Sequence, residues 1–358
     1  MNPPLATRRV LLALALAVAI PSASQTLMIP AVPELVRERG VGPTAATWLL
    51  SGFLIGASVA APFLGRLGDL HGRRPLILAS SFLYLVGSLV CLAGSSSLLV
   101  LVVGRLLPGV SAGIFVLALA TVQDLFPWGR RAFGIGLLSA VVGIGPAVGF
   151  VVGGLLTELA GFESVFLLGA GVALVSGLLS WWWVPNSGGR AQGQVDVVGA
   201  TLLAVWMTVP LVALSRAEVW GLTSLPMAAA GVLTVVLVWA WVLVERRATS
   251  PLVDVALLTR PVVARTNLAS LVMAGATLGL FVTVPQLVQV PQDGGFGLGY
   301  GPIGAGLVLV PGAIVMLVVG PISAAVGARV GEHVCVVAGG VIAAVGLARF
   351  RATVRVAP

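Results

Sequence analysis

Long apolar runs, almost free of charged residues, restrict the folds open to this 358-residue sequence more than any other feature. Eleven such runs follow one another, and most reach the ~20 residues that an α-helix needs to cross a bilayer. Apolar residues are continuous within each run rather than alternating, which argues against the strands of a membrane barrel. We therefore expect an all-α polytopic membrane protein with about 11 transmembrane helices.

The positions of the expected helices follow from these runs. They are about 10–32, 46–64, 76–94, 98–120, 132–156, 164–184, 197–215, 224–244, 262–286, 303–326 and 333–348. The first run has the preceding arginines and following small residues of a cleaved signal peptide. Because apolar character resumes at once in TLMIPAV and many runs follow, an uncleaved first helix is the better interpretation.

The arginines predict how the helices are oriented. With the amino terminus in the cytoplasm, thirteen arginines fall on the cytoplasmic side, namely Arg8, Arg9, Arg66, Arg73, Arg74, Arg130, Arg131, Arg190, Arg246, Arg247, Arg260, Arg265 and Arg329. Only Arg37, Arg39 and Arg216 fall in outer loops before the tail. Cytoplasmic loops of membrane proteins carry this excess. We expect a multi-pass protein of the cell membrane, and the net charge of +8 then requires no nucleic-acid partner.

The densest polar cluster is GRLGDLHGRRPLI, between the second and third runs. Its candidate functional residues are Gly65, Gly68, Asp69, Gly72, Arg73 and Arg74. Glycines allow a tight turn and close helix approach, and the aspartate can pair with an arginine or accept from a helix start. An ordinary polar loop needs arginines but not this order of glycines and aspartate.

The fourth run contains GRLLPGVSAGIF, which buries Arg105 within an apolar span. A charge at the bilayer centre costs ~2.5–3.5 kcal/mol on insertion scales, so such an arginine normally faces the bundle interior or a water-filled path. The alternative is a side chain that reaches the outer interface along the helix.

The fifth run contains GIGPAVGFVVGG, in which Gly145, Gly149 and Gly153 recur every four residues and Gly154 follows. Such a ridge suits close helix packing, and Pro146 should bend the helix. A plain face for helix dimerisation is the alternative interpretation.

Three tryptophans, Trp181, Trp182 and Trp183, end the sixth run. Their rings can bind cations. However, aromatic residues gather at both membrane interfaces, so we interpret them as part of such a belt.

Together these motifs resemble the major facilitator superfamily. The stretch 65–77 resembles its signature between the second and third helices. Arg105 and Gly109 match an arginine and glycine of its proton-coupled exporters, although Pro108 replaces the usual glutamine, and the glycine–proline ridge resembles the antiporter motif of its drug exporters. The resemblance implies the superfamily fold, with the first motif as a latch, Arg105 and Gly109 on a proton path, and alternating access.

A weaker copy of the first motif, GPISAAVGARVGEH, follows the tenth run. It keeps Gly327, Arg329 and Gly331 but has Ala328 at the acidic position, so the ninth run should open a second half. This arrangement resembles the fourteen-helix drug:proton antiporter branch, of which 11 helices would be present. The implied organisation is a six-helix bundle over 1–190, two inserted helices over 191–250, a partial second bundle over 251–348 and an atypical basic tail over 349–358.

The sequence departs from that branch in its first helix. Pro21 stands where the branch often has an aspartate, and the first run holds no acidic residue. Coupling to a proton gradient therefore stays open. Isolated histidines and cysteines, and the lack of a Ser/His/Asp set, argue against a metal site, a cofactor or an enzyme.

The leading hypothesis is a secondary active transporter that exports a drug or another small lipophilic or cationic compound. A non-transporting remnant of such a gene is the alternative, because the branch would need three more helices. The substrate, the direction of transport and the oligomeric state are left open.

Overall fold

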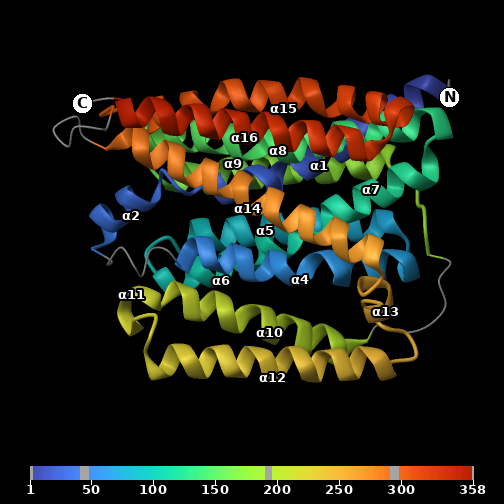
Figure 1. Ribbon diagram of the computed structural model, residues 1–358, viewed down its shortest axis with the longest axis horizontal. Coiled ribbons are helices and arrows are strands. Elements are labelled where there is room, and N and C mark those ends of the chain that lie inside the picture. Colours follow the sequence, from blue (N-terminus) through green and yellow to red (C-terminus); the bar gives the residue numbers. More distant parts are fainter. Residues whose placement is uncertain (1–2, 41–47, 190–195, 291–297, 357–358) are drawn as a thin grey trace.

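The computed structural model describes residues 3–40, 48–189, 196–290 and 298–356, and the regular secondary structure within these ranges is helical. Figure 1 shows the helices running side by side along the long axis of the molecule. They are α1 (Pro3–Leu27), α2 (Val32–Arg39), α4 (Trp48–His71), α5 (Arg73–Ala93), α6 (Leu98–Ser111), α7 (Ile114–Leu125), α8 (Trp128–Ala160), α9 (Glu163–Trp183), α10 (Val197–Ser215), α11 (Ala217–Trp220), α12 (Leu225–Arg247), α13 (Val255–Leu258), α14 (Pro261–Gln289), α15 (Pro302–Val330) and α16 (Glu332–Val356).

Eight stretches of the described chain are long and apolar enough to cross a membrane: α1, α4, α5, α6 with α7, α8, α9, α10 and α12. Three further helices, α14, α15 and α16, have 29, 29 and 25 residues. Each expected apolar run coincides with one of these helices. The protein is therefore an all-α polytopic membrane protein.

Two expected helices have different ends in the structure. The first ends at Leu27 rather than near residue 32, and α2 begins separately with a proline in its first turn, where a missing backbone N–H costs nothing. The fourth divides into α6 and α7. There the N–H groups of Ala112 and Gly113 donate to carbonyls only three residues back, in Gly109 and Val110, at 2.9 and 3.3 Å.

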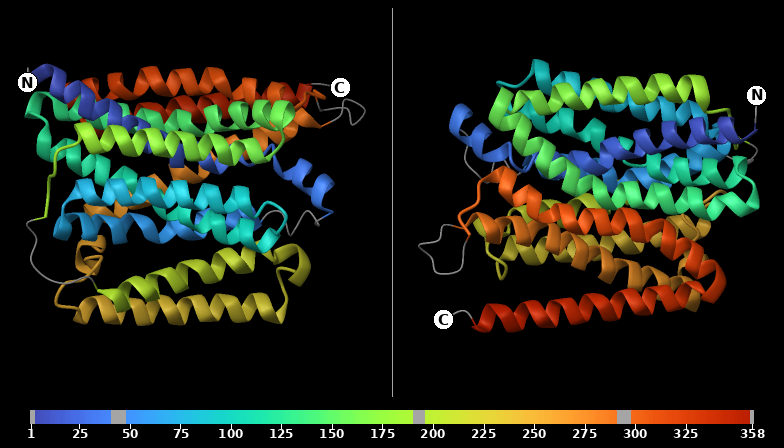
Figure 2. Two further views of the ribbon diagram at one scale, coloured as in Figure 1. Left: turned by 180° about the vertical axis from the view of Figure 1, so that it is seen from behind. Right: turned by 90° about the horizontal axis from the view of Figure 1, so that it is seen from above.

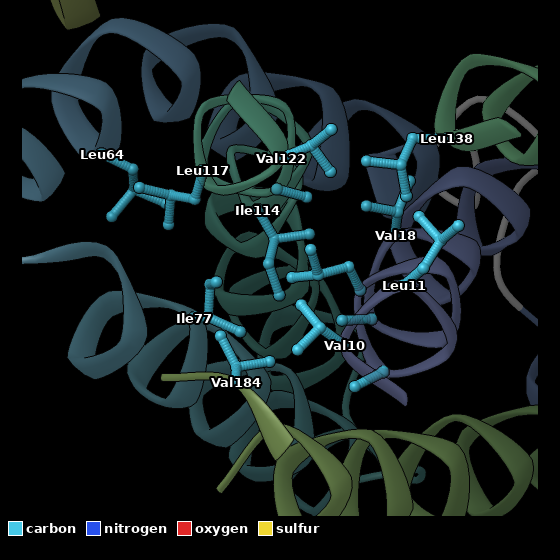
Figure 3. Packing of buried hydrophobic residues seen from close by; sticks show 14 of the residues in the cluster. Val10, Leu11, Val18, Leu64, Ile77, Ile114, Leu117, Val122, Leu138 and Val184 are labelled. Atoms are coloured by element: carbon cyan, nitrogen blue, oxygen red, sulfur yellow. The ribbon is translucent and has the colours of Figure 1, made fainter. Parts of the chain in front are cut away.

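A buried core joins α1, α4, α5, α7 and α8 (Figure 3). Val18 of α1, Leu117 of α7 and Leu138 of α8 belong to it, and each is at most 1% exposed. Lipid tails are as apolar as these side chains, so contact between membrane helices depends on close packing rather than on escape from water. This core holds five of the first six spans together, and Leu179 and Trp183 of α9 pack against it.

The α10 and α12 helices form a hairpin beside α4, at the lower edge of Figure 1. Leu203 of α10, Trp241 of α12 and Val255 of α13 form a buried cluster, and Val59 of α4 packs against it. The rings of Trp206 and Trp241 lie 5.9 Å apart between the two helices. This hairpin corresponds to the two helices expected between residues 191 and 250, whereas the division into domains stays a prediction.

Of the last three helices, α15 and α16 lie at the upper edge of Figure 1, opposite the hairpin, and α14 crosses in front of the bundle from α13. The α15 helix packs along α8, and α14 packs against α15. In the view from above in Figure 2, α16 lies at the edge of the molecule, and most of its described side chains are exposed. The start of α1, the α4–α5 junction, the α7–α8 junction and α13 all lie at the end of the bundle marked N in Figure 1, so the arginines of these segments share one end. Which side of the membrane this end faces stays a prediction.

Candidate functional site

The α4–α5 junction is a turn that only glycine fits. Gly72 has φ +91°, and its N–H donates to the Gly68 carbonyl at 3.0 Å, which closes the last turn of α4. A Cβ on Gly72 would lie 2.4 Å from Oδ1 of Asn186, and one on Gly68 would lie 2.7 Å from Cδ2 of Leu117. Gly65 is different, because a Cβ there would meet Val116 at an ordinary 3.6 Å.

Arg73 connects this junction to α7. Its guanidinium donates to the Asp124 carboxylate and to the Ala120 carbonyl, and it lies 3.5 Å from Oδ1 of Asp69. The Arg73 side chain is 12% exposed, whereas Asp69 is 52% exposed. Asp124 is therefore the closer partner of Arg73, and sequence reasoning missed it. Its signal was a lone acidic residue at the end of an apolar run.

The segment after α9 covers the same junction. The backbone N–H of Arg73 donates to the Ser187 carbonyl at 2.7 Å. Gly188 and Gly189 have φ +75° and +74°, and a Cβ on either would lie 3.0 Å from backbone atoms of the junction. The hollow next to it, about 860 Å³ in volume, is lined by Asp69, Arg73, Gln123, Asp124, Leu125, Arg131, Asn186, Ser187, Gly188 and Gly189.

Arg74 turns to α9 instead. Its guanidinium donates to the Trp181 carbonyl and lies 5.2 Å from the centroid of the Trp181 ring. Trp181 and Trp182 are 59% and 69% exposed. Trp181 thus contacts a cation of this chain while the rings of Trp181 and Trp182 remain exposed, whereas Trp183 is partly buried against the core.

The α15–α16 junction has the same geometry. Gly331 has φ +99°, and its N–H donates to the Gly327 carbonyl at 2.9 Å, as Gly72 does to Gly68. Arg329 is exposed. The two halves of the predicted repeat therefore share a helix–glycine–helix turn, although the acidic residue of the first is missing from the second.

Arg105 lies in the bundle interior and is 3% exposed. Its guanidinium donates to Oγ of Ser24 at 2.9 Å, to the Ser24 carbonyl at 3.0 Å and to the Leu49 carbonyl at 3.4 Å. The guanidinium carbon lies 5.1 Å from the centroid of the Phe53 ring. It connects α6 to α1 and α4 and does not extend along the helix to the membrane interface.

Gly109, four residues after Arg105, allows α6 to approach α4. A Cβ on Gly109 would lie 2.3 Å from the Phe53 carbonyl oxygen, and one on Gly56 would lie 2.4 Å from the Leu106 carbonyl oxygen. Neither helix has room for a larger residue at this crossing.

The glycine ridge of α8 faces α1. Cβ atoms on Gly145, Gly149 and Gly153 would lie 2.5, 2.3 and 2.1 Å from Oγ of Ser22, the Ala23 oxygen and the Leu27 oxygen, respectively. Oγ1 of Thr26 donates to the Pro146 carbonyl at 2.7 Å. Gly154 is also buried. Since α1 of the same chain covers the ridge, this face is not open to a second copy.

A cavity of about 520 Å³ lies between the first six spans and α14–α15. It is lined by Val18, Pro21, Ser22, Gln25, Phe53, Leu54, Ala57, Ala112, Phe115, Ser139, Val142, Gly143, Pro146, Met273, Ala274, Thr277 and Met316. Pro21, which stands where the drug:proton antiporter branch often has an aspartate, lies on this wall. Pro146 and Phe53 connect the cavity directly to the α1–α8 contact and to Arg105.

Comparisons with known proteins agree with this geometry. The sequence profile of the Major Facilitator Superfamily matches residues 14–350. The tetracenomycin C resistance and export protein of Streptomyces glaucescens is 31% identical over 316 residues, which cover 86% of this chain and 56% of that protein. The drug efflux pump JefA of Mycobacterium tuberculosis is 29% identical over 284 residues, which cover 78% of this chain and 54% of that pump.

Solved structures share the fold at low sequence identity. A peptide transporter POT in complex with sulfate has a TM-score of 0.60 at 16% identity, covering 90% of this chain and 69% of its own. The proton:xylose symporter XylE bound to 6-bromo-6-deoxy-D-glucose has a TM-score of 0.59 at 14% identity, with the same coverage of 90% and 69%. This chain spans between 36% and 60% of the length of the first curated relatives that it matches.

Proposed function

Because the chain belongs to the major facilitator superfamily, we propose that it is a secondary active transporter that exports a small lipophilic or cationic compound, such as a drug, from the cell. The central cavity carries this proposal. It lies between the two sets of helices that would rock against each other, which is where transporters hold their substrate. Relatives named as an export protein and a drug efflux pump support the outward direction.

The α4–α5 junction supports an alternating-access mechanism. Arg73 holds this junction to Asp124 of α7, and Asp69 lies within reach of the same guanidinium. In our proposal this ion-pair set holds one end of the transporter shut and releases when the helices rock. The end that carries the latch and the amino terminus would face the cytoplasm, in accordance with the arginine distribution.

The proposal also includes antiport against protons. Arg105 is its candidate coupling group, because a buried guanidinium with neutral partners responds to any charge that enters nearby. The matched glycine ridge of α8 is the second supporting feature.

The organisation that we propose is a six-helix bundle over 1–190, an inserted hairpin over 191–250 and a second bundle that begins at 251. The hairpin of α10 and α12 supports the fourteen-helix branch. The alternative is a non-transporting remnant. Efflux by cells that express only these 358 residues distinguishes the two proposals, and the DNA after codon 358 shows whether further spans follow.

The deciding experiment measures retention of neutral and cationic fluorescent compounds in cells with and without the protein. We expect lower retention with the protein and a partial reversal when the proton gradient is collapsed. Equal retention of every compound in both cell lines would remove the transport proposal. Unchanged efflux after the gradient is collapsed would remove the proton coupling alone.

A further inference from the structure

The central cavity offers few polar groups, and all of those that the structure describes are neutral. They are the hydroxyls of Ser22, Ser139 and Thr277 and the amide of Gln25. Aliphatic side chains, two phenylalanine rings and two thioethers provide the rest of the described wall. No carboxylate lies among these described lining residues.

A positive charge lies directly behind this wall. The Phe53 ring lines the cavity on one side and has the Arg105 guanidinium at 5.1 Å from its centroid. Within the described part of the chain, the hydrogen bonds of Arg105 go to neutral oxygens of Ser24 and Leu49. Among the residues that the structure describes, this buried guanidinium therefore has only neutral hydrogen-bond partners.

The charge of a ligand should decide whether it enters such a cavity. A cation would lose its hydration, find no carboxylate on the described wall and meet the field of Arg105 in a medium of low dielectric constant. A neutral aromatic compound loses little hydration and gains contacts with rings and thioethers. An anion is attracted by the same field that repels a cation.

We infer that the cavity binds lipophilic aromatic compounds that carry no positive charge and discriminates against lipophilic cations. This inference rests on the proposed transport function and narrows it to one class of substrate. The relevant chemistry is an aromatic skeleton small enough for about 520 Å³, with a hydroxyl, carbonyl or carboxylate that the neutral polar groups of the wall can bind.

The test uses three compounds with one skeleton: anthracene-9-methanol, anthracene-9-carboxylate and 9-(aminomethyl)anthracene as its cation. Each is titrated into the purified 358-residue chain in detergent, and energy transfer from tryptophan to anthracene reports binding. We expect saturable binding of the alcohol and the carboxylate and at least ~tenfold weaker binding of the cation, which is the effect of one charge ~10 Å away at an effective dielectric constant near 20.

Two variants identify the site of binding. Ala274→Phe fills the cavity from the α14 side, where Ala274 is exposed, so the saturable signal of all three compounds should fall to the level of partition into detergent. Gln25→Glu keeps the shape of the side chain and adds a negative charge to the wall, so it should strengthen binding of the cation at least ~tenfold. Thermal unfolding of each variant verifies that it is folded. If Ala274→Phe is not folded, competition by an excess of an aromatic alcohol that does not accept energy from tryptophan replaces it.

Each outcome decides the inference. Cation binding as strong as alcohol binding in the unchanged protein would overturn it, and so would the lack of any saturable binding. A Gln25→Glu variant with unchanged preference would also contradict the electrostatic cause. If the compounds bind as expected but cells show no efflux, the proposed transport function alone is removed. If cells export cations only, the transport function stands and this inference is removed.

Discussion

Arg73 and Asp124 are separated by 51 residues in the sequence, and their side chains form an ion pair between the α4–α5 junction and the end of α7. Asp69, which the sequence motif places four residues before Arg73, lies farther from the guanidinium, at 3.5 Å. The proposed latch is therefore a three-residue arrangement in which Asp124, outside the motif, makes the closer contact with Arg73.

Replacing Asp124 with asparagine should slow efflux several-fold and lower stability by less than ~1 kcal/mol, because partly exposed ion pairs contribute little to folding. A double-mutant cycle with Arg73→Gln measures the coupling in both quantities. Glu158→Gln, at an exposed position at the end of α8, is the matched control. Additive effects of the two replacements on efflux would show that the pair does not act as a unit.

Gly149→Ala should destabilise the protein by ~1–3 kcal/mol, the usual effect of overpacking. The new Cβ would lie 2.3 Å from the Ala23 carbonyl oxygen, and backbone cannot give way as a flexible side chain can. Thermal unfolding in detergent measures the change. Gly171→Ala is the control, since nothing lies within 4 Å of a Cβ at that position of α9. Equal unfolding temperatures for both variants would contradict the close contact between α8 and α1.

Arg105→Met should separate stability from transport. An apolar side chain of similar length relieves the cost of the buried charge, so the unfolding temperature should stay the same or rise. Efflux should fall at least ~tenfold, which corresponds to ~1.4 kcal/mol of lost stabilisation at a functional step. Arg105→Lys keeps the charge but lacks the planar guanidinium that binds Ser24 and Leu49 together, so it should rescue efflux only in part. Full efflux by the methionine variant would rule out a role for the charge.

Gly72→Ala should cost ~1–3 kcal/mol, because φ +91° with ψ 153° is a region that is essentially confined to glycine. The added Cβ would also meet Oδ1 of Asn186 at 2.4 Å. A second replacement, Asn186→Ala, should relieve the steric part and leave the backbone strain. Gly65→Ala, with its ordinary contact at 3.6 Å, should be close to neutral. If Asn186→Ala restored full stability, the backbone strain would be negligible.

Local features made much of this protein predictable from its sequence. Continuous apolar runs identify membrane spans because a bilayer demands ~20 apolar residues whatever surrounds them. Gly72 and Gly331 predict turns, because the backbone freedom of glycine is a property of the residue itself. The interior position of Arg105 was the expected one for the same reason, since a charge within an apolar span is costly wherever lipid surrounds it.

Only the tertiary structure decided which residues meet across helices. Asp124 as the partner of Arg73, Asn186 over Gly72, Ser24 and Leu49 around Arg105, and the joining of Met316 to Pro21 in one cavity all depend on how helices face one another. A helix that is apolar on every side carries no periodic pattern that reveals its inner face. The sequence therefore determined where the chain crosses the membrane and where it turns. Helix packing decided which residues surround Arg73 in the proposed latch and which line the cavity.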